Sequence, residues 1–432
     1  MKKLYIEFYN REIGEGKTSN ILLRNGFSAV YNLCEDIVAI EMDWLYPEKT
    51  VNELKEKCKN YTDVYITSFW WREIFLIYLV SKDLPEVNFT VGGPSAIWMH
   101  TEGRFSELPK LKNFVITGNT LDSVFNNFNN KKWGLNIPNI EYRDDEIVHF
   151  VIPKTIPCSW GRCKFCDGHS ISNMPITNSF DTNFIEKLPD KIKNLKKAVM
   201  YSASSFTAED IQFIVPIINR DPNILHYFFW RAERQEAEKL KYVMEKIKYP
   251  ENLFFFVGVE FLGTRMLKYI DKGLTAEDYI YTLQTINQFG SNLALIIILG
   301  WNNLIYNDVD DIYNNFSKLD LRNSSMKTRV LTVTPMTEKH FSKDFIGCEK
   351  VYFPIELPEI KDRPDIWKDS YSWKYKLIDE KQKMYNNAIV NILKDMKFKT
   401  FFDNYKSFSF SSKTPIENSL TKKETKKKEK IW

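Results

Sequence analysis

The chain alternates short apolar segments with amphipathic helical segments over most of its length, and this alternation limits the folds open to it. Within the first 135 residues the pattern predicts strands at 63–69, 86–93 and 112–118, and helices at 51–61, 72–85 and 121–128. Such an alternation is typical of an α/β protein with a doubly wound parallel sheet. We expect a Rossmann-like domain over residues 1–135, with its binding crevice near Ser68 and the Gly92–Gly93 pair, where strands end.

A second alternation follows, with five predicted strands at 196–205, 225–230, 253–261, 293–300 and 328–335, and three predicted helices at 208–220, 234–247 and 275–290. Repeated strand–helix units predict a partial (β/α) barrel over residues 153–345, whose working loops follow the carboxyl ends of the strands.

Three further segments complete the predicted domain organisation. Residues 136–152 contain the turn residues Asp144 and Asp145, which predict a linker hairpin between the two domains. The sequence pattern of residues 346–410 predicts a mixed helical region. Residues 411–432 are polar and rich in lysine, so we expect a disordered tail.

Composition excludes several classes of protein. Apolar residues make up 44% and charged residues 27% of the 432 residues, which is the balance of a soluble globular protein. The net charge is only +4, and much of it lies in residues 421–432, so nucleic acid is not an expected partner. No stretch is long and apolar enough to span a membrane. With six cysteines in so long a chain, we expect a cytoplasmic protein rather than a disulfide-stabilised secreted one.

Three of the six cysteines lie within nine residues, at Cys158, Cys163 and Cys166. Thiolates at such short spacing select zinc, copper(I) or an iron–sulfur cluster, although three unrelated buried thiols are also an option. With His169 the set could hold a structural zinc ion. The C-x4-C-x2-C spacing matches plant-type [2Fe-2S] ferredoxins, but their fourth cysteine is missing nearby, since the next is Cys348. The last option is a [4Fe-4S] cluster with three cysteine ligands and one open iron.

Four segments, in this order, resemble radical S-adenosylmethionine (SAM) enzymes that have an N-terminal cobalamin-binding-like domain: PCSWGRCKFCDG, WRAERQEAEKL, FFFVGVEFLGTRMLKYIDKGLTAEDY and LIIILGWNN. The resemblance covers about residues 60–340. The cysteine triad is one residue longer than the family's commonest C-x3-C-x2-C. Its pattern C-x-W-G-x-C-x-F-C-x-G is most similar to ribosomal peptide maturases, some of which resemble peptide epimerases.

The resemblance implies one [4Fe-4S] cluster ligated by Cys158, Cys163 and Cys166, with SAM bound to the open iron. It also implies reductive cleavage of SAM to a 5'-deoxyadenosyl radical, with the electron supplied by a reductant such as flavodoxin or ferredoxin. The radical would remove a hydrogen from an unactivated C–H bond in a peptide or small-molecule substrate. If the enzyme is an epimerase, Cys348 is the candidate that returns a hydrogen to the substrate.

The same resemblance assigns contacts to SAM. Phe165 would lie near the adenine, and Ser202 and Ser204 fall where the family binds the SAM amino group. Arg234 could hold the SAM carboxylate with two hydrogen bonds. Glu260 ends an apolar strand at the position of the ribose or methionine contact, and a carboxylate there is costly unless it is paired.

The N-terminal domain departs from the pattern of cobalamin-binding domains. The segment EMDWLYPEKT lacks the histidine of the D-x-H-x-x-G motif, and bulky rings at Phe69, Trp70 and Trp71 replace small residues. Gly92–Gly93 matches the glycine pair that lets a nucleotide tail approach. Cobalamin therefore stays open as a cofactor, and a cobalamin-dependent methyltransferase is the alternative activity. A zinc-binding or electron-transfer protein without enzymatic activity is the alternative of another class.

Overall fold

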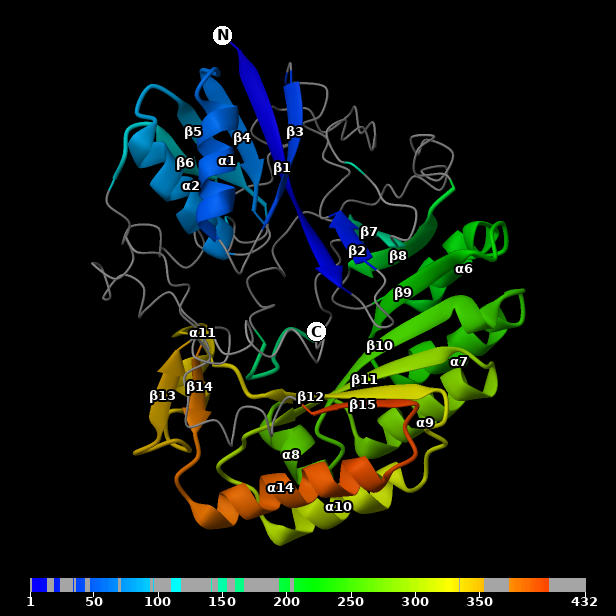
Figure 1. Cartoon of the computed structure of the whole chain (residues 1–432). Helices are drawn as coiled ribbons and strands as arrows, with labels where there is room; N and C mark the ends of the chain where they lie inside the picture. Colours follow the sequence, from blue (N-terminus) through cyan, green and yellow to red (C-terminus); the bar gives the residue numbers. More distant parts are fainter. Residues whose placement is uncertain are drawn as a thin grey trace, which may run out of the picture.

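One sheet runs through almost the whole protein and joins its two lobes (Figure 1). The computed structural model describes residues 2–13, 19–23, 34, 36–42, 47–68, 71–93, 96, 110–117, 141, 147–153, 160–166, 194–202, 206–333, 335–352 and 373–403. Within them, thirteen strands form this sheet, in the order β15-β12-β11-β10-β9-β8-β7-β2-β1-β4-β5-β6 with β3 also paired to β1.

The N-terminal lobe contains β1 (Lys3–Ile13), β3 (Asp36–Glu41), α1 (Pro47–Cys58), β4 (Asp63–Thr67), α2 (Trp71–Asp83), β5 (Asn88–Gly92) and β6 (Phe114–Ile116). Its five strands pair in parallel in the spatial order β3-β1-β4-β5-β6. This is the flavodoxin-like variant of the doubly wound sheet, which reverses direction between β1 and β4. An apolar cluster that includes Leu54, Ile66 and Ile77 packs the helices against the sheet. The predicted Rossmann-like lobe is confirmed.

Strand β1 connects the two lobes because it is long enough to pair twice. Its first half lies between β3 and β4, and its second half pairs antiparallel with β2 (Ser19–Leu23). Strand β2 in turn pairs in parallel with β7 (Ile147–Pro153), the first strand of the second lobe.

The predicted hairpin at residues 136–152 differs from the structure where the structure describes it. Residues 147–152 belong to β7, and both neighbours of β7 are parallel to it, whereas the second arm of a hairpin would be antiparallel. The alternation of IVHFVIP fits a strand of either orientation, so the turn residues at 144–145 were the misleading signal. Asp144 and Asp145 themselves lie outside the described residues, as does the tail at 411–432.

The second lobe is a curved parallel sheet covered by helices on its outer face (Figure 1). It contains β7, β8 (Lys196–Ser202), α6 (Ala208–Ile218), β9 (Ile224–Trp230), α7 (Arg234–Met244), β10 (Leu253–Glu260), α8 (Thr264–Tyr269), α9 (Ala276–Gln288), β11 (Asn292–Leu299), α10 (Tyr306–Phe316) and β12 (Ser324–Val330). Strands β7 to β12 are all parallel. Every second side chain of β9, β10 and β11 is buried under the helices. The predicted partial barrel is confirmed.

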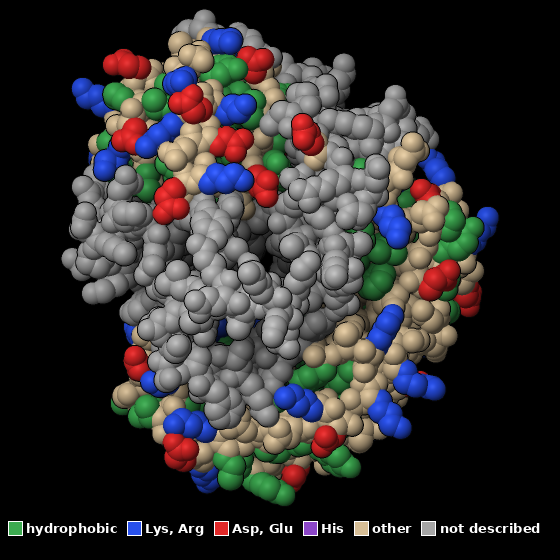
Figure 2. Space-filling model, in the orientation of Figure 1, with side chains coloured by type: hydrophobic (Ala, Val, Ile, Leu, Met, Phe, Trp, Pro, Cys, Tyr) green, Lys and Arg blue, Asp and Glu red, His purple; other side chains and the backbone are tan. Residues whose placement is uncertain are grey.

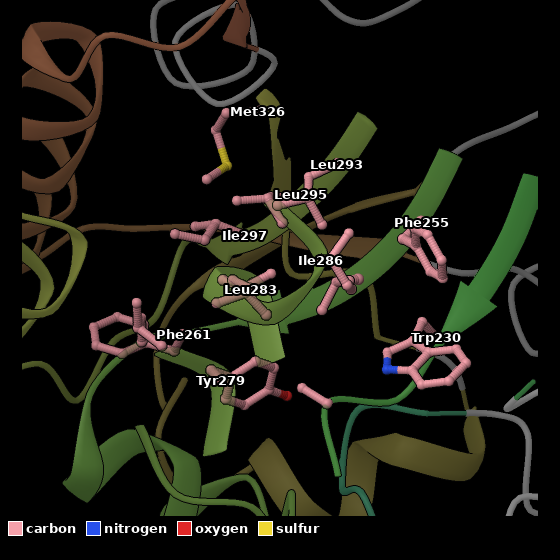
Figure 3. Packing of buried hydrophobic residues seen from close by; sticks show 14 of the residues in the cluster. Trp230, Phe255, Phe261, Tyr279, Leu283, Ile286, Leu293, Leu295, Ile297 and Met326 are labelled. Carbon is pink, nitrogen blue, oxygen red and sulfur yellow. The ribbon is translucent and has the colours of Figure 1, made fainter. Parts of the chain in front are cut away.

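The core of this lobe lies between the sheet and its helices. Figure 3 shows Leu283 and Ile286 of α9 against Leu295 and Ile297 of β11, with the ring of Tyr279 at the lower edge of the group. These side chains are almost completely buried. Burial of each contributes about 1.5–3 kcal/mol, so this layer fixes the positions of the strand ends.

The C-terminal region contains more strand than the sequence indicated. After α11 (Pro335–Phe341), strands β13 (Glu349–Tyr352) and β14 (Trp373–Lys376) form an antiparallel pair. Helix α14 (Glu380–Asp395) follows, and β15 (Thr400–Asp403) adds to the barrel sheet parallel to β12. These strands have four residues each, too few for their periodicity to stand out in the sequence.

The charged side chains of both lobes are mixed in sign. On the face shown in Figure 2, described lysines and arginines alternate with aspartates and glutamates. No described helix is long and apolar enough to cross a membrane.

Helix α14 holds the loop after β11 through a buried amide. Asn386 accepts a hydrogen bond from Gly300 N–H at 2.7 Å and donates one to Trp301 O at 2.9 Å. Next to it, Gln382 bonds both backbone groups of Leu304. Because Asn386 is fully buried, its removal leaves two backbone groups without partners.

We therefore expect Asn386→Ala to lower the free energy of unfolding by about 3 kcal/mol in urea titrations, since each unpaired buried group costs ~1–3 kcal/mol. The control is Met384→Ala on the exposed side of the same helix, which should change the free energy of unfolding by less than ~0.5 kcal/mol. Equal losses in the two variants would contradict this role for Asn386.

Candidate active site

The candidate site lies at the carboxyl ends of the parallel strands of the second lobe. The cysteine loop follows β7, Arg231 follows β9, Glu260 ends β10 and Gly300 follows β11. In a parallel sheet these ends share one edge, so residues far apart in the sequence meet there. Lys272, twelve residues after Glu260, completes the group.

The described part of the cysteine loop, residues 160–166, is compact. Cys163 is buried, Cys166 is half-buried, and neither forms a disulfide. The N–H of Cys166 donates to Cys163 O at 3.1 Å, which folds the two thiol-bearing residues into one turn. Cys158 and His169 lie outside the described residues, so the complete ligand set stays a prediction.

The loop is seated on the turn at residues 270–273, which follows α8. Trp160 Nε1 donates to Asp271 O at 2.6 Å, and Lys164 N–H donates to Ile270 O at 3.0 Å. The guanidinium of Arg162 stacks on the Trp160 ring, 3.9 Å from its centroid. Gly273 has a φ of +67°, and a Cβ there would lie 2.3 Å from Trp160 Cζ2, so only glycine fits beneath the ring.

A buried ion pair lies beside the loop. Lys272 Nζ donates to Glu260 Oε1 at 3.1 Å, and both side chains are only about a tenth exposed. The ammonium also lies 5.2 Å from the centroid of the half-buried Phe165 ring. Burial alone would lower the pKa of Lys272, but the neighbouring Tyr279, Glu260 and Cys163 outweigh burial and raise it. Lys272 is therefore a fixed positive charge next to the thiols.

The backbone of Glu260, which forms this ion pair, has a strained left-handed conformation. Glu260 has a φ of +60°, and the register of β10 against β11 shifts between Gly258 and Glu260. A Cβ on Gly258 would lie 2.3 Å from Glu260 Oε1, so the glycine leaves the space into which the carboxylate folds. A left-handed conformation in a residue with a side chain costs roughly 1–2 kcal/mol, and such strain collects at functional sites.

Arg231 is a site residue that the sequence reasoning missed. Its side chain is 8% exposed, and it donates to Glu233 Oε1 at 2.6 Å and to Lys272 O at 2.7 Å. Its guanidinium also lies 5.5 Å from the centroid of the Trp160 ring. In the sequence, Arg231 directly follows a predicted strand and so falls at the working edge of the barrel; this position could have identified it.

Arg234, the arginine predicted from the sequence, lies elsewhere. It is the exposed first residue of α7, and its guanidinium stacks over Tyr281 of α9 at 4.5 Å from the ring centroid. Arg234 thus contacts the helical layer, through Tyr281, rather than the cysteine loop.

The other predicted residues are placed only in part. Ser202 is the last residue of β8, in register with Pro153 of β7, which puts its backbone at the working edge. Ser204 lies outside the described residues. Cys348 is half-buried, its Sγ lies 3.8 Å from Asn302 Nδ2, and burial raises its pKa. Its contacts are with the loop after β11 and with the segment that precedes α14, where it lies near the Ile378 backbone.

In the N-terminal lobe, Gly92 and Gly93 allow the ends of two neighbouring strands to lie close together. Gly93 has a φ of +95°, and a Cβ there would lie 2.6 Å from Ser68 O. Ser68 N–H donates to Gly92 O at 2.8 Å, so the pair joins the ends of β4 and β5 closely. Of the bulky residues predicted in this crevice, Phe69 and Trp70 lie outside the described residues.

The residues around the two described thiols fit a cluster of thiolate ligands. Lys272, Arg231, Arg162 and Lys164 all lie on or against the loop or its seat. Cations near cysteines favour thiolates, and here three of these cations are also paired with the carboxylates of Glu260, Glu233 and Asp271.

We expect Gly273→Ala to reduce the iron content and visible absorbance of the anaerobically reconstituted protein several-fold, because the added methyl group displaces Trp160 and unseats the loop. Gly290→Ala is the matched control. Gly290 has a φ of +76°, so it carries a similar backbone cost of ~1 kcal/mol, but a Cβ there meets nothing within 4 Å. Equal iron loss in both variants would show that backbone strain, rather than the Trp160 seat, is responsible.

Comparison with known proteins places the fold. No family model and no curated protein matches the sequence. Several solved structures resemble it at low identity, among them those of OxsB and TsrM. The cobalamin-dependent SAM radical enzyme OxsB, with aqua-cobalamin and SAM bound, matches at a TM-score of 0.51 and 14% identity over 100% of this chain, which spans 62% of the OxsB chain. The radical SAM methyltransferase TsrM from Kitasatospora setae, with cobalamin and a [4Fe-4S] cluster bound, matches at a TM-score of 0.58 and 12% identity over 97% of this chain and 95% of its own. The chain therefore has the fold of these radical SAM enzymes.

Proposed function

We propose that the protein is a radical SAM enzyme that holds one [4Fe-4S] cluster through Cys158, Cys163 and Cys166. The observation that carries the proposal is the seated cysteine loop beside the buried Glu260–Lys272 pair, at the working edge of a fold shared with OxsB and TsrM. When bound, the cluster and SAM would supply one-electron cleavage of SAM and a radical that abstracts hydrogen.

The chain's own groups would bind and orient SAM. Glu260 would accept hydrogen bonds from SAM hydroxyls or its amino group, and its bond to Lys272 would hold the carboxylate in position. Phe165 presents a half-buried ring beside that pair, suited to stacking on adenine. Arg231 replaces Arg234 as the candidate partner for the SAM carboxylate. Ser202 and Ser204 stay candidates for the amino group.

The substrate we propose is a ribosomally made peptide, on the basis of the cysteine-loop pattern that resembles peptide maturases. An epimerase would need a group that returns a hydrogen atom to the substrate radical, and Cys348 is the candidate donor. Its thiol would become a thiyl radical, which an electron from the reductant and a proton would return to the thiol. A flavodoxin or ferredoxin in the cytoplasm would supply the electron.

The main test is anaerobic reconstitution followed by assay of SAM cleavage under reductant. Replacing Cys158, Cys163 or Cys166 by alanine should abolish the cluster and reduce 5'-deoxyadenosine formation by more than ~100-fold, because each ligand is needed to hold the cluster. Cys34→Ala, a thiol in the N-terminal lobe, should retain both within ~2-fold. A colourless protein that carries one zinc ion per chain and leaves SAM intact would sink the proposal and favour the zinc alternative.

A cobalamin-dependent methyltransferase is the second candidate, favoured by the flavodoxin-like strand order of the N-terminal lobe. If this candidate is right, cobalamin added to the reconstituted protein stays bound through gel filtration, and methyl transfer from SAM becomes detectable. Loss of all cobalamin on the column, together with 5'-deoxyadenosine formation in its absence, favours the first candidate.

A further inference from the structure

The side chains on the inner face of the barrel change from aromatic to charged between one side and the other. On each strand the residues that alternate with the helix-covered ones are half-buried or exposed. The central ones are Tyr227 and Phe229 on β9, Phe254 and Phe256 on β10, Ala294, Ile296 and Ile298 on β11, and Lys327 and Arg329 on β12. We call this surface the inner wall; it passes from aromatic through aliphatic to cationic.

The aromatic side of the inner wall is a packed platform. Tyr227 stacks on Phe254 with ring centroids 4.7 Å apart, and Phe229 stacks on Phe256 at 5.4 Å. Gly258 follows Phe256 two positions later on the same face, directly below the Glu260 carboxylate. The platform therefore leads up to the candidate SAM site and offers apolar surface to a substrate group there.

The cationic side lies two strands away. Lys327 pairs in register with Ile296, and Arg329 with Ile298, so both follow the aliphatic strip on the same face. Both side chains are exposed. Among the residues that the structure describes, Arg329 has no acidic partner, and Lys374 of β14 is a charged neighbour. Burial, and to a smaller extent the charge of Arg329, lower the pKa of Lys374 to about 8.

Cations crowded at one edge of a concave wall attract an anion, and the apolar strip beside them attracts an apolar group. Strands β10 and β12 are two strand spacings apart, roughly 10 Å. An amino-acid unit with a large apolar side chain and a carboxylate can span this distance, with the long side chains of Lys327 and Arg329 reaching toward it. A free amino acid would also bring an ammonium group against these cations, whereas an acylated nitrogen would not.

We propose that the inner wall binds the C-terminal residue of a peptide, with its apolar side chain on the β10–β11 surface and its carboxylate on Arg329 and Lys327. This assignment rests on the proposed radical SAM function and names the substrate segment that the site would take.

The test measures binding of small probes to the reconstituted protein with SAM and without reductant, by calorimetry. N-acetylphenylalanine carries ring and carboxylate, N-acetylphenylalaninamide only the ring, and N-acetylglycine only the carboxylate. We expect the first to bind at least ~10-fold more tightly than either of the others, since each half of the inner wall contributes. Free phenylalanine should bind more weakly than its N-acetylated form.

The variant Lys327→Gln/Arg329→Gln should reduce the affinity for N-acetylphenylalanine to that for the amide. Arg322→Gln is the matched control, because Arg322 is an exposed arginine just before β12 that is paired with Asp320 outside the inner wall. It should leave the preference unchanged. Phe256→Leu should weaken both ring-bearing probes equally. Thermal unfolding checks that each variant is folded.

Equal affinity for acid and amide, an equal effect of the control, or tighter binding of free phenylalanine would each overturn the assignment. SAM cleavage is measured in the same preparations. Cleavage without discrimination among probes defeats this inference alone, whereas absence of cleavage in the wild type defeats the proposed function whatever the probes show.

Discussion

The seat beneath the cysteine loop is the contact on which the candidate site depends. Trp160 stands before the two described thiols and hydrogen-bonds to Asp271, more than a hundred residues later. The turn that receives the ring also carries Lys272, so one short segment fixes both the loop and the positive charge beside it. The described part of the cysteine loop, residues 160–166, contains no helix or strand, so contacts with the turn at 270–273 hold it in place. Arg231, bonded to Lys272 O, ties the same segment to the end of β9.

The Glu260–Lys272 pair shows how the fold accommodates a buried charge at a functional edge. In the sequence, a carboxylate ends the apolar run FFFVGVE, and an isolated charge there would be costly. The structure accommodates the charge with a lysine partner, a register shift and a glycine that leaves room for the carboxylate. Pairing removes the cost of an isolated charge, but it does not explain why the charge is there, since an apolar pair would be as stable. Stability alone thus gives no reason for this arrangement, and the proposed SAM site would supply one.

The sequence allowed the architecture to be predicted but not all of its connections. Long periodic segments such as LALIIILG and the helix that begins after Thr275 gave both lobes, because burial against a partner layer imposes their pattern. The pairing of β1 with three strands, and the addition of β15, depend on tertiary contacts that leave no local pattern. In the candidate site, the motif segments contain Cys163, Cys166 and Glu260, which the structure brings to the same edge, while their roles stay predictions. Arg231, and not the predicted Arg234, contacts the turn under the cysteine loop, because three residues of a strand-to-helix turn decide which arginine lies at that edge.

The two lobes share one sheet, and this continuity has a consequence for binding. Strand β1 belongs to both, so the working edge of the N-terminal lobe and that of the barrel are linked through backbone hydrogen bonds rather than by a flexible connection. Relative motion of the lobes would break paired strands, which costs far more than bending a linker. Gly93 and Ser68 close the β4–β5 end of the N-terminal lobe in the same rigid manner. Any ligand held by both lobes must therefore fit a geometry that is set by the sheet.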